Sequence, residues 1–232
     1  MSVAQPEPHR QVANGGFRAA LFGLADGLVT NVSLILGFAG ANPGHNVVRL
    51  AGLAGLVAGA FSMGSGEYLS VRSQRDLLLY EIEVERRALA TSPEEERLEL
   101  RQTFLDQGIS EELAERLSTD LMRDPELALR THTREELGVD PSAIGAPWTA
   151  ALSSFALFSL GAVVPLLPWL VTSSGQEVWW SVGLTAVVTA LVGAGVGHFT
   201  RRGLAYAAGR MLLITGLSAA VTYGIGHLVG VG

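Results

Sequence analysis

Five long apolar stretches alternate with short polar connections and one longer polar region along this chain. The stretches lie at about 19–40, 47–70, 149–171, 178–199 and 208–230, and each is long enough for a membrane helix of about 20 residues. Charge nearly vanishes within them: Glu177 is the only charged residue from Trp148 to Thr200. Five such stretches in 232 residues would leave a soluble globule without a polar surface. We therefore predict five transmembrane helices.

Most ionisable residues fall between the second and third apolar stretches. Residues 80–140 carry seventeen Asp or Glu side chains against eight Arg, a net charge near −9 compared with −6 for the whole chain. Such a region will not hold nucleic acid or anionic lipid, and it will attract cations. Composition alone would allow disorder here, but the placement of Pro, Gly and Ser favours helices.

We predict that the second apolar helix continues through Ser73 to about Leu89, followed by three short helices. Helix starts are predicted at Ser92-Pro93 (with Glu95 completing a capping box), Ser110 and Asp124-Pro125, and helix ends at Gly108 and Gly138. The apolar residues expected to form a small shared core are Leu98, Phe104, Leu105, Ile109, Leu113, Leu117, Leu121, Leu127 and Leu129.

The predicted fold is an all-α integral membrane protein with a three-helix acidic domain inserted between transmembrane helices 2 and 3. We divide the chain into a polar tail at 1–16, transmembrane helices 1–2 at 17–75, the helical domain at 76–140 and transmembrane helices 3–5 at 141–232. The first sixteen residues are polar, so no cleavable signal peptide is predicted.

Arginine predicts the orientation, since the chain contains no lysine. Arginines cluster before the first span (Arg10, Arg18), after the second (Arg72, Arg75) and between the fourth and fifth (Arg201, Arg202, Arg210). By the positive-inside rule the N-terminus and the polar domain are cytoplasmic and the C-terminus lies outside. The chain has no cysteine, which excludes disulfides and thiolate metal sites.

Tryptophans mark the expected edges of the membrane. Trp148 and Trp169 bracket the third span, about 31 Å apart along a helix, and Trp179 with Trp180 opens the fourth. Because Trp prefers the water–lipid boundary, we expect all four side chains there.

Asp26 lies near the middle of the first apolar stretch. An ionised carboxylate inside a bilayer costs about 2.5–3.5 kcal/mol on insertion scales, so it is seldom kept without a partner. Arg49 and Arg210 lie close to the ends of the second and fifth stretches, and no Arg lies nearer the middle of a span. The remaining partners are a metal cation or a proton.

Met63 and Glu67 are four residues apart near the end of the second span and project from one helix face. A thioether beside a carboxylate offers a soft and a hard ligand together, which suits a transition metal. A lone Met is usually a packing residue. It becomes a candidate here because Glu67 stands beside it and Asp26 lacks another partner.

Three pairs in the polar domain have ligand spacing: Glu81 with Glu85, Glu96 with Glu99, and His132 with Glu136. Carboxylates with an imidazole suit Fe²⁺, Mn²⁺, Zn²⁺ or Co²⁺ better than Ca²⁺. The ordinary alternative for any one Glu pair is a solvated charged face. We assign Glu94, Glu95, Glu111, Glu112, Glu115 and Glu126 to such a face.

Four segments together resemble the vacuolar iron transporter family, and the likeness covers about 17–230, in the manner of a prokaryotic-type member. They are Gly23-Leu-Ala-Asp-Gly-Leu28, Gly59-Ala-Phe-Ser-Met-Gly-Ser-Gly-Glu-Tyr-Leu-Ser-Val-Arg-Ser-Gln74, Arg134-Glu-Glu-Leu-Gly138 and Gly161-Ala-Val-Val-Pro-Leu-Leu-Pro168. The resemblance implies a five-helix homodimer that exports Fe²⁺, and often Mn²⁺, from the cytoplasm in exchange for protons. It also implies a pathway at the two-fold axis, lined by Asp26 and Met63. The residues that match the family's metal-domain carboxylates are Glu85, Glu96, Glu99 and Glu136.

The chain departs from the family pattern at three positions. Gly55 stands where plant members have a carboxylate eight residues before the intramembrane Met, and Glu67 is a possible replacement for that charge. Ala88 stands where a further metal-domain Glu is expected, with Glu81 as a possible substitute. His132 replaces a Met, which keeps a ligand but makes it harder.

Three classes of function follow. The first is a proton-coupled divalent metal transporter, not an enzyme and without a prosthetic group, which serves iron detoxification and homeostasis. Fe²⁺ would collect on the Glu/His cluster, pass Met63 and Glu67, and cross beside Asp26. The second is a membrane-anchored ferroxidase or iron-storage protein that uses the acidic helices; a receptor or scaffold with neither metal binding nor flux is a third. The arginine-only basic composition hints at a prokaryotic plasma membrane instead of a vacuole.

Overall fold

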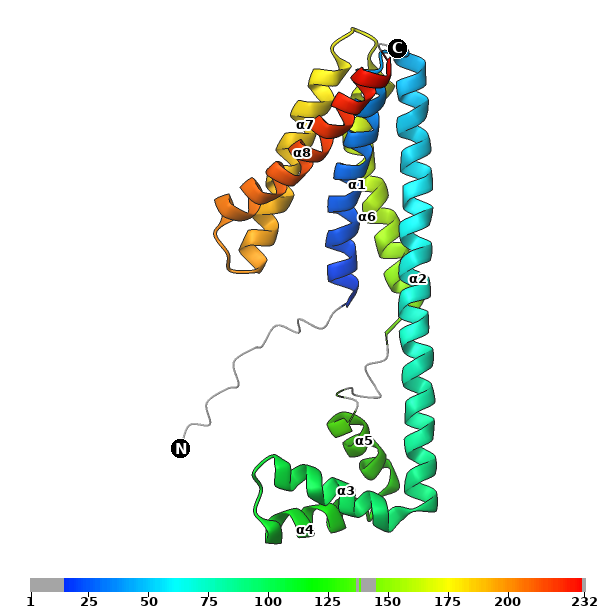
Figure 1. Ribbon diagram of the computed structural model, residues 1–232, viewed down its shortest axis with the longest axis vertical. Coiled ribbons are helices and arrows are strands. Elements are labelled where there is room, and N and C mark those ends of the chain that lie inside the picture. The colour runs from blue at the N-terminus through cyan, green and yellow to red at the C-terminus, as the bar shows by residue number, and fades with distance from the viewer. Residues whose placement is uncertain (1–14, 137, 139–144, 231–232) are drawn as a thin grey trace. The chain divides into compact units, whose positions relative to one another are not determined.

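The computed structural model describes the backbone of residues 15–136, 138 and 145–230, with side chains from residue 21 onward (Figure 1). These residues form helices and connecting turns, and no strand occurs among them. The all-α prediction is confirmed for this part of the chain. Most of the predicted 1–16 tail, and the predicted boundary at 140–141, lie outside the described residues.

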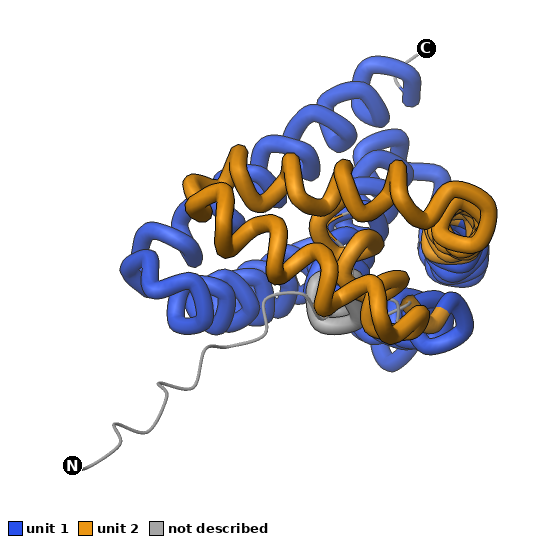
Figure 2. The backbone as a smooth tube through the Cα atoms, turned by 90° about the horizontal axis from the view of Figure 1, so that it is seen from below, with its two compact units in different colours: residues 1–69, 147–232 blue, residues 70–146 orange. Residues whose placement is uncertain are grey.

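Eight helices follow one another along the described chain. They are α1 (Gly15–Gly40), α2 (His45–Thr91), α3 (Pro93–Asp106), α4 (Glu111–Leu121), α5 (Pro125–Glu136), α6 (Pro147–Val171), α7 (Glu177–Phe199) and α8 (Leu204–Gly230). Five of them, α1, α2, α6, α7 and α8, are long and apolar enough to cross a membrane, and they coincide with the five predicted spans. The chain divides into two compact units, residues 1–69 with 147–232 and residues 70–146 (Figure 2). We call them the apolar unit and the acidic unit.

Close backbone contact between α1 and α6 organises the apolar unit. A Cβ added to Gly27 would collide with the carbonyl oxygen of Phe158, and one added to Gly161 would collide with that of Leu24. Lipid tails are as apolar as these side chains, so membrane helices associate through such close packing instead of through the hydrophobic effect. The two glycines therefore bring the helix that carries Asp26 against α6.

Replacing Gly27 with alanine should destabilise the apolar unit by about 1–3 kcal/mol, because the methyl group meets backbone that cannot rotate away. Gly183 is the matched control, since a Cβ there meets nothing within 4 Å. Thermal denaturation of both purified variants in detergent checks this. Equal melting temperatures for the two variants would contradict the close contact.

Several buried polar groups in the apolar unit are joined across helices, which lowers the cost of holding them in lipid. Asn31 Nδ2 donates to the Ala162 carbonyl at 2.6 Å, and the Ser33 and Ser218 hydroxyls lie 2.8 Å apart. Trp169 Nε1 donates to Ser181 Oγ at 3.0 Å, so this indole faces the helix bundle. Only 5 % of Trp169 is exposed, whereas Trp148, Trp179 and Trp180 are exposed. The indole turns inward because a hydroxyl within the bundle satisfies its N–H.

In the acidic unit, α2 continues as an unbroken helix to Thr91, as predicted. Helix α5 begins after Asp124, whose Oδ1 accepts hydrogen bonds from the Glu126 amide at 3.0 Å and the Leu127 amide at 3.3 Å. Helix α3 begins at Pro93 as expected, but the Ser92 side chain makes no capping hydrogen bond, so the capping-box prediction is wrong. Gly108 and Gly138 have positive φ and follow the ends of α3 and α5.

The core of the acidic unit is smaller than predicted. Leu100, Phe104 and Ala114 are buried, and Leu105, Ile109, Leu117 and Leu121 pack on them. Leu98, Leu113 and Leu127, which we expected inside, are exposed. On α3 the reason is periodicity: Leu100 lies one turn from Phe104 on the same face, whereas Leu98 points elsewhere. Leu129 is buried as expected.

Candidate metal site and membrane pathway

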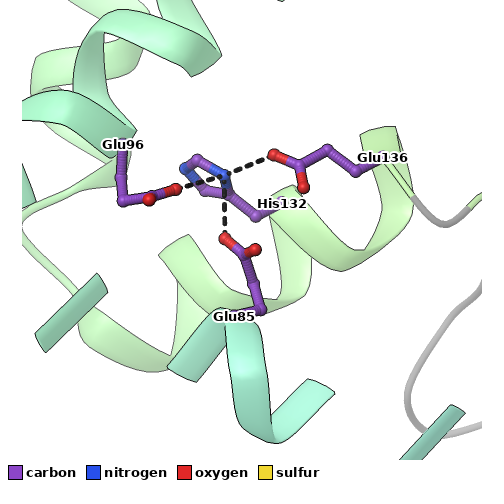
Figure 3. A group of neighbouring side chains, drawn as sticks. All are labelled: Glu85, Glu96, His132 and Glu136. Carbon is purple, nitrogen blue, oxygen red and sulfur yellow. Dashed lines mark hydrogen bonds and ion pairs between the residues drawn. The ribbon is translucent and has the colours of Figure 1, made fainter. Parts of the chain in front are cut away.

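Four ligand-bearing side chains from three helices meet inside the acidic unit (Figure 3). Helix α2 supplies Glu85, α3 supplies Glu96, and α5 supplies His132 and Glu136 one turn apart. Each offers a ligand atom, and the four atoms lie within 4.8 Å of one another. We call this group the Glu/His cluster.

The imidazole stands at the centre of the cluster. His132 Nδ1 lies 3.1 Å from Glu85 Oε1, 3.1 Å from Glu136 Oε1 and 3.7 Å from Glu96 Oε2. The His132 side chain is 1 % exposed, compared with 13 % for Glu85 and 33 % for Glu136. The cluster is thus covered on most sides but open at Glu136.

One imidazole cannot satisfy three carboxylates. Nδ1 carries at most one hydrogen, and its hydrogen-bond geometry is met only toward Glu136. Glu85 Oε1 is buried without a hydrogen-bond donor, and so is the other ring nitrogen, Nε2 of His132. Buried polar atoms are seldom left unpaired, because each costs about 1–3 kcal/mol. A divalent cation in place of the proton would be shared by all four ligands, and one nitrogen with three carboxylates suits Fe²⁺, Mn²⁺, Co²⁺ or Zn²⁺.

Burial and the repulsion between neighbouring carboxylates raise the pKa of two Glu side chains in the cluster. Burial, followed by the charge of Glu136, raises the pKa of Glu85 to about 7. Burial also raises the pKa of Glu96 above its ordinary range. The metal-free cluster therefore holds a proton on its carboxylates under conditions where an exposed Glu is ionised.

Metal affinity at the cluster should rise as the pH increases through about 7 and then level off, since the proton on Glu85 must leave before a cation binds. The stability of the metal-free fold should change in the opposite direction. The folded state binds more protons than the unfolded state between about 4.5 and 7, so unfolding becomes easier as the pH rises across this interval. Calorimetric titration of the full-length protein with Mn²⁺ at pH 5.5, 6.5 and 7.5 checks this. Equal affinity at all three pH values would contradict the claim that a proton on Glu85 competes with the metal.

Two of the six predicted metal-domain residues lie outside this group. Glu99 is exposed on α3, although its charge still contributes to the raised pKa of Glu85. Glu81 lies on α2 one turn before Glu85, about 6 Å along the helix, and its carboxylate is not in the cluster. Three acids that we assigned to a solvated face form ion pairs. Glu94 pairs with Arg97 within α3, and Glu111 and Glu115 of α4 pair with Arg97 and Arg101 of α3.

Asp26 lies half-buried in the middle of α1. Its Oδ1 accepts a hydrogen bond from Thr30 Oγ1 at 3.2 Å, one turn further along the helix. Among the described side chains Asp26 makes no ion pair with Arg or His. Within the described residues, the carboxyl group of Asp26 is therefore supported by a neutral hydroxyl and not by a basic side chain.

Met63 and Glu67 are half-buried on α2. Met63 packs against the buried cluster of Ala60, Phe158 and Ala162, so the packing role that a Met usually has is present here as well. Gly55 of α2 faces Asn31 and Leu34 of α1. Because α1 and α2 are joined by the short turn at 41–44, they run antiparallel. Met63, about 12 Å beyond Gly55, then lies at a depth near Asp26.

The departure at Gly55 has a steric basis. A Cβ at this position would collide with Leu34 Cδ2 and lie 2.8 Å from Asn31 Oδ1. Asn31 is fully buried, and its Oδ1 has no hydrogen-bond partner in the described structure. A carboxylate at 55 would require both side chains to move. Glu67 remains the acidic residue of α2 that lies within the apolar unit.

One buried acid received no role from the sequence. Glu177, at the first position of α7, is only 4 % exposed. Its position as the lone charged residue between Trp148 and Thr200 was visible in the sequence. That it is buried beside His45 is a consequence of the fold, because two separate turns bring these residues to one cavity.

Known proteins similar to this chain agree with the geometry. The sequence profile described as the VIT family matches residues 17–227. Vacuolar iron transporter 1 of Oryza sativa subsp. japonica is 32% identical over 228 residues, which cover 96% of this chain and 89% of the relative. The vacuolar iron transporter of Acanthamoeba castellanii is 31% identical over 92% of this chain and 78% of its own length. Vacuolar iron transporter 1 of Arabidopsis thaliana is 32% identical over 79% of this chain and 74% of its own length. The match across nearly all of the chain shows that this protein belongs to the VIT family.

Proposed function

We propose that this protein exports divalent transition metal, Fe²⁺ and also Mn²⁺, from the cytoplasm across a membrane in exchange for protons. Relatives named as iron transporters support metal transport and a carrier instead of an enzyme. The observation that carries the proposal for this chain is the Glu/His cluster, whose four ligand atoms lie within 4.8 Å of one another. Its mixed oxygen and nitrogen donors suit the proposed cargo.

In this proposal the acidic unit is cytoplasmic and concentrates metal before transport. The arginine distribution supports this orientation, with the C-terminus outside. A plasma membrane is the location if the host is a prokaryote, and a vacuolar membrane if it is a eukaryote. Protease access to the acidic unit in sealed vesicles of known orientation tests the topology.

The transport pathway is proposed to pass Met63 and Glu67 and then Asp26. All three are half-buried in one copy of the chain, so a single copy would expose part of each side chain to lipid. For an ionised carboxylate this exposure costs about 2.5–3.5 kcal/mol. A homodimer that covers these faces would remove that cost. Light scattering in detergent tests it, and a monomer under conditions of full transport would exclude a shared pathway.

The ferroxidase or storage alternative is less well supported. Di-iron carboxylate proteins place Glu-x-x-His motifs on two helices. Here one His and three Glu converge on a single point, which fits one ion. The alternative also gives Asp26, Met63 and Glu67 no role.

Metal uptake into proteoliposomes tests the proposal. Fe²⁺, Mn²⁺ and Zn²⁺ are offered separately, with and without a pH gradient across the membrane. We expect saturable Fe²⁺ and Mn²⁺ flux that is faster when protons can move in the opposite direction. Metal flux that does not depend on the pH gradient would exclude proton exchange but would still support metal transport. Oxygen consumption without metal flux would favour the ferroxidase.

A further inference from the structure

A cavity of about 290 Å³ lies at one end of the apolar unit, between the turn that joins α1 to α2 and the turn that joins α6 to α7. Its polar lining includes Asn42, His45, Ser173 and Glu177. Its apolar lining includes Val48 and Trp169, which form a buried cluster with Leu166. The cavity is distinct from the Glu/His cluster and from Asp26, Met63 and Glu67.

Glu177 brings a carboxylate to this cavity although it is 4 % exposed. Backbone amides of the α6–α7 turn point at it, including that of Gly175, which donates to Oε1 at 3.1 Å. Capping of the turn therefore explains part of its presence. A carboxylate offers about four lone-pair directions, so it can still serve another ligand. Capping does not explain the imidazole on the same wall.

His45 brings that imidazole and is held in place by aromatic contact. Its ring lies 5.3 Å from the ring of Trp169 and is tilted by 36°. Trp169 is fixed in turn by its hydrogen bond to Ser181, whose hydroxyl donates to the Pro165 carbonyl at 2.7 Å. The described residues make no hydrogen bond to either ring nitrogen of His45. The ring is thus positioned by Trp169 on the wall of the cavity.

We infer that this cavity is a second binding site for a divalent transition metal, with His45 and Glu177 as its protein ligands. Imidazole and carboxylate together suit Fe²⁺, Mn²⁺, Co²⁺ or Zn²⁺, and water fills the remaining positions. Two protein ligands should bind more weakly than the four of the Glu/His cluster. His45 and Glu67 are separated by about 33 Å along α2, close to the thickness of the hydrocarbon core. As a step in transport, which rests on the proposed function, the site lies where metal leaves after passing Asp26.

The test uses the full-length protein with the Glu/His cluster disabled by Glu85→Gln and His132→Ala. Co²⁺ is the probe, because its visible absorption reports nitrogen and oxygen ligation. Two further variants preserve the local structure: His45→Phe keeps a ring on Trp169, and Glu177→Gln keeps an acceptor for the Gly175 amide. His227→Ala is the matched control, since His227 is near Gly40 at the same end of the unit but does not line the cavity.

We expect saturable Co²⁺ binding in the cluster-disabled protein. His45→Phe and Glu177→Gln should each weaken it about tenfold or more, whereas His227→Ala should leave it unchanged. Absence of this binding, or binding that neither variant weakens, would overturn the inference. Flux of the protein with an intact Glu/His cluster, measured in parallel, separates the two proposals. Binding that responds to both variants in a protein without metal flux would keep the site and refute transport, and flux without such binding would do the reverse.

Discussion

Replacing Asp26 with asparagine should reduce metal flux to the level of empty liposomes. Asparagine has nearly the same shape and keeps an oxygen for the hydrogen bond from Thr30, so the change removes the charge and little else. A carboxylate–cation interaction worth about 3 kcal/mol inside the membrane corresponds to a loss of roughly a hundredfold. Initial rates of Fe²⁺ uptake into proteoliposomes measure this.

Thr30→Val is the matched control for this experiment, since it removes the hydrogen bond and keeps the carboxylate. We expect it to retain most of the flux. Both variants should elute normally in size-exclusion chromatography and bind metal at the Glu/His cluster as the native protein does. Native flux in Asp26→Asn would show that this carboxylate is not in the pathway.

Replacing His132 with alanine should weaken metal binding by the acidic unit by at least about tenfold to a hundredfold. The imidazole is 1 % exposed and faces three carboxylates, so its loss removes the nitrogen ligand and leaves the acids to repel one another. Titration of the full-length protein with Mn²⁺ or Co²⁺ measures the change. Glu112→Gln, an exposed acid of α4, is the control for lost negative charge and should bind normally.

The Glu85→Gln variant distinguishes a role of Glu85 in binding metal from a role in stabilising the fold. Its carboxylate is largely buried and its pKa is raised to about 7, so the metal-free protein should become more heat-stable when the acid is neutralised. The same variant should bind metal more weakly. A variant that lost stability and kept its affinity would mean that Glu85 is a structural partner of His132 and not a ligand.

Hydropathy and helix punctuation were sufficient to predict the five spans and the three short helices, because both are local properties of the chain. Burial depended on contacts that are not local. Trp169 turned inward because Ser181, on the next helix, supplies an acceptor for its indole N–H. Leu98 was expected in the core, but the face of α3 that packs is set by Leu100 and Phe104.

The candidate site shows the same division. The pairing of His132 with Glu136 is visible as a spacing of one helical turn. Their meeting with Glu85 and Glu96 depends on how α2, α3 and α5 fold together, which a spacing rule cannot supply. The same rule pairs Glu96 with Glu99 and Glu81 with Glu85, yet only one member of each pair reaches the cluster. The roles of all these residues in binding, and of Asp26, Met63 and Glu67 in transport, stay predictions.

The most direct measurement is Fe²⁺ entry into sealed liposomes that contain only the purified chain, followed by a metal-sensitive dye trapped inside. The account predicts a saturable signal well above that of protein-free liposomes, carried by the half-buried carboxylate on α1. A signal equal to that of protein-free liposomes, from protein whose Glu/His cluster still binds metal, would contradict it.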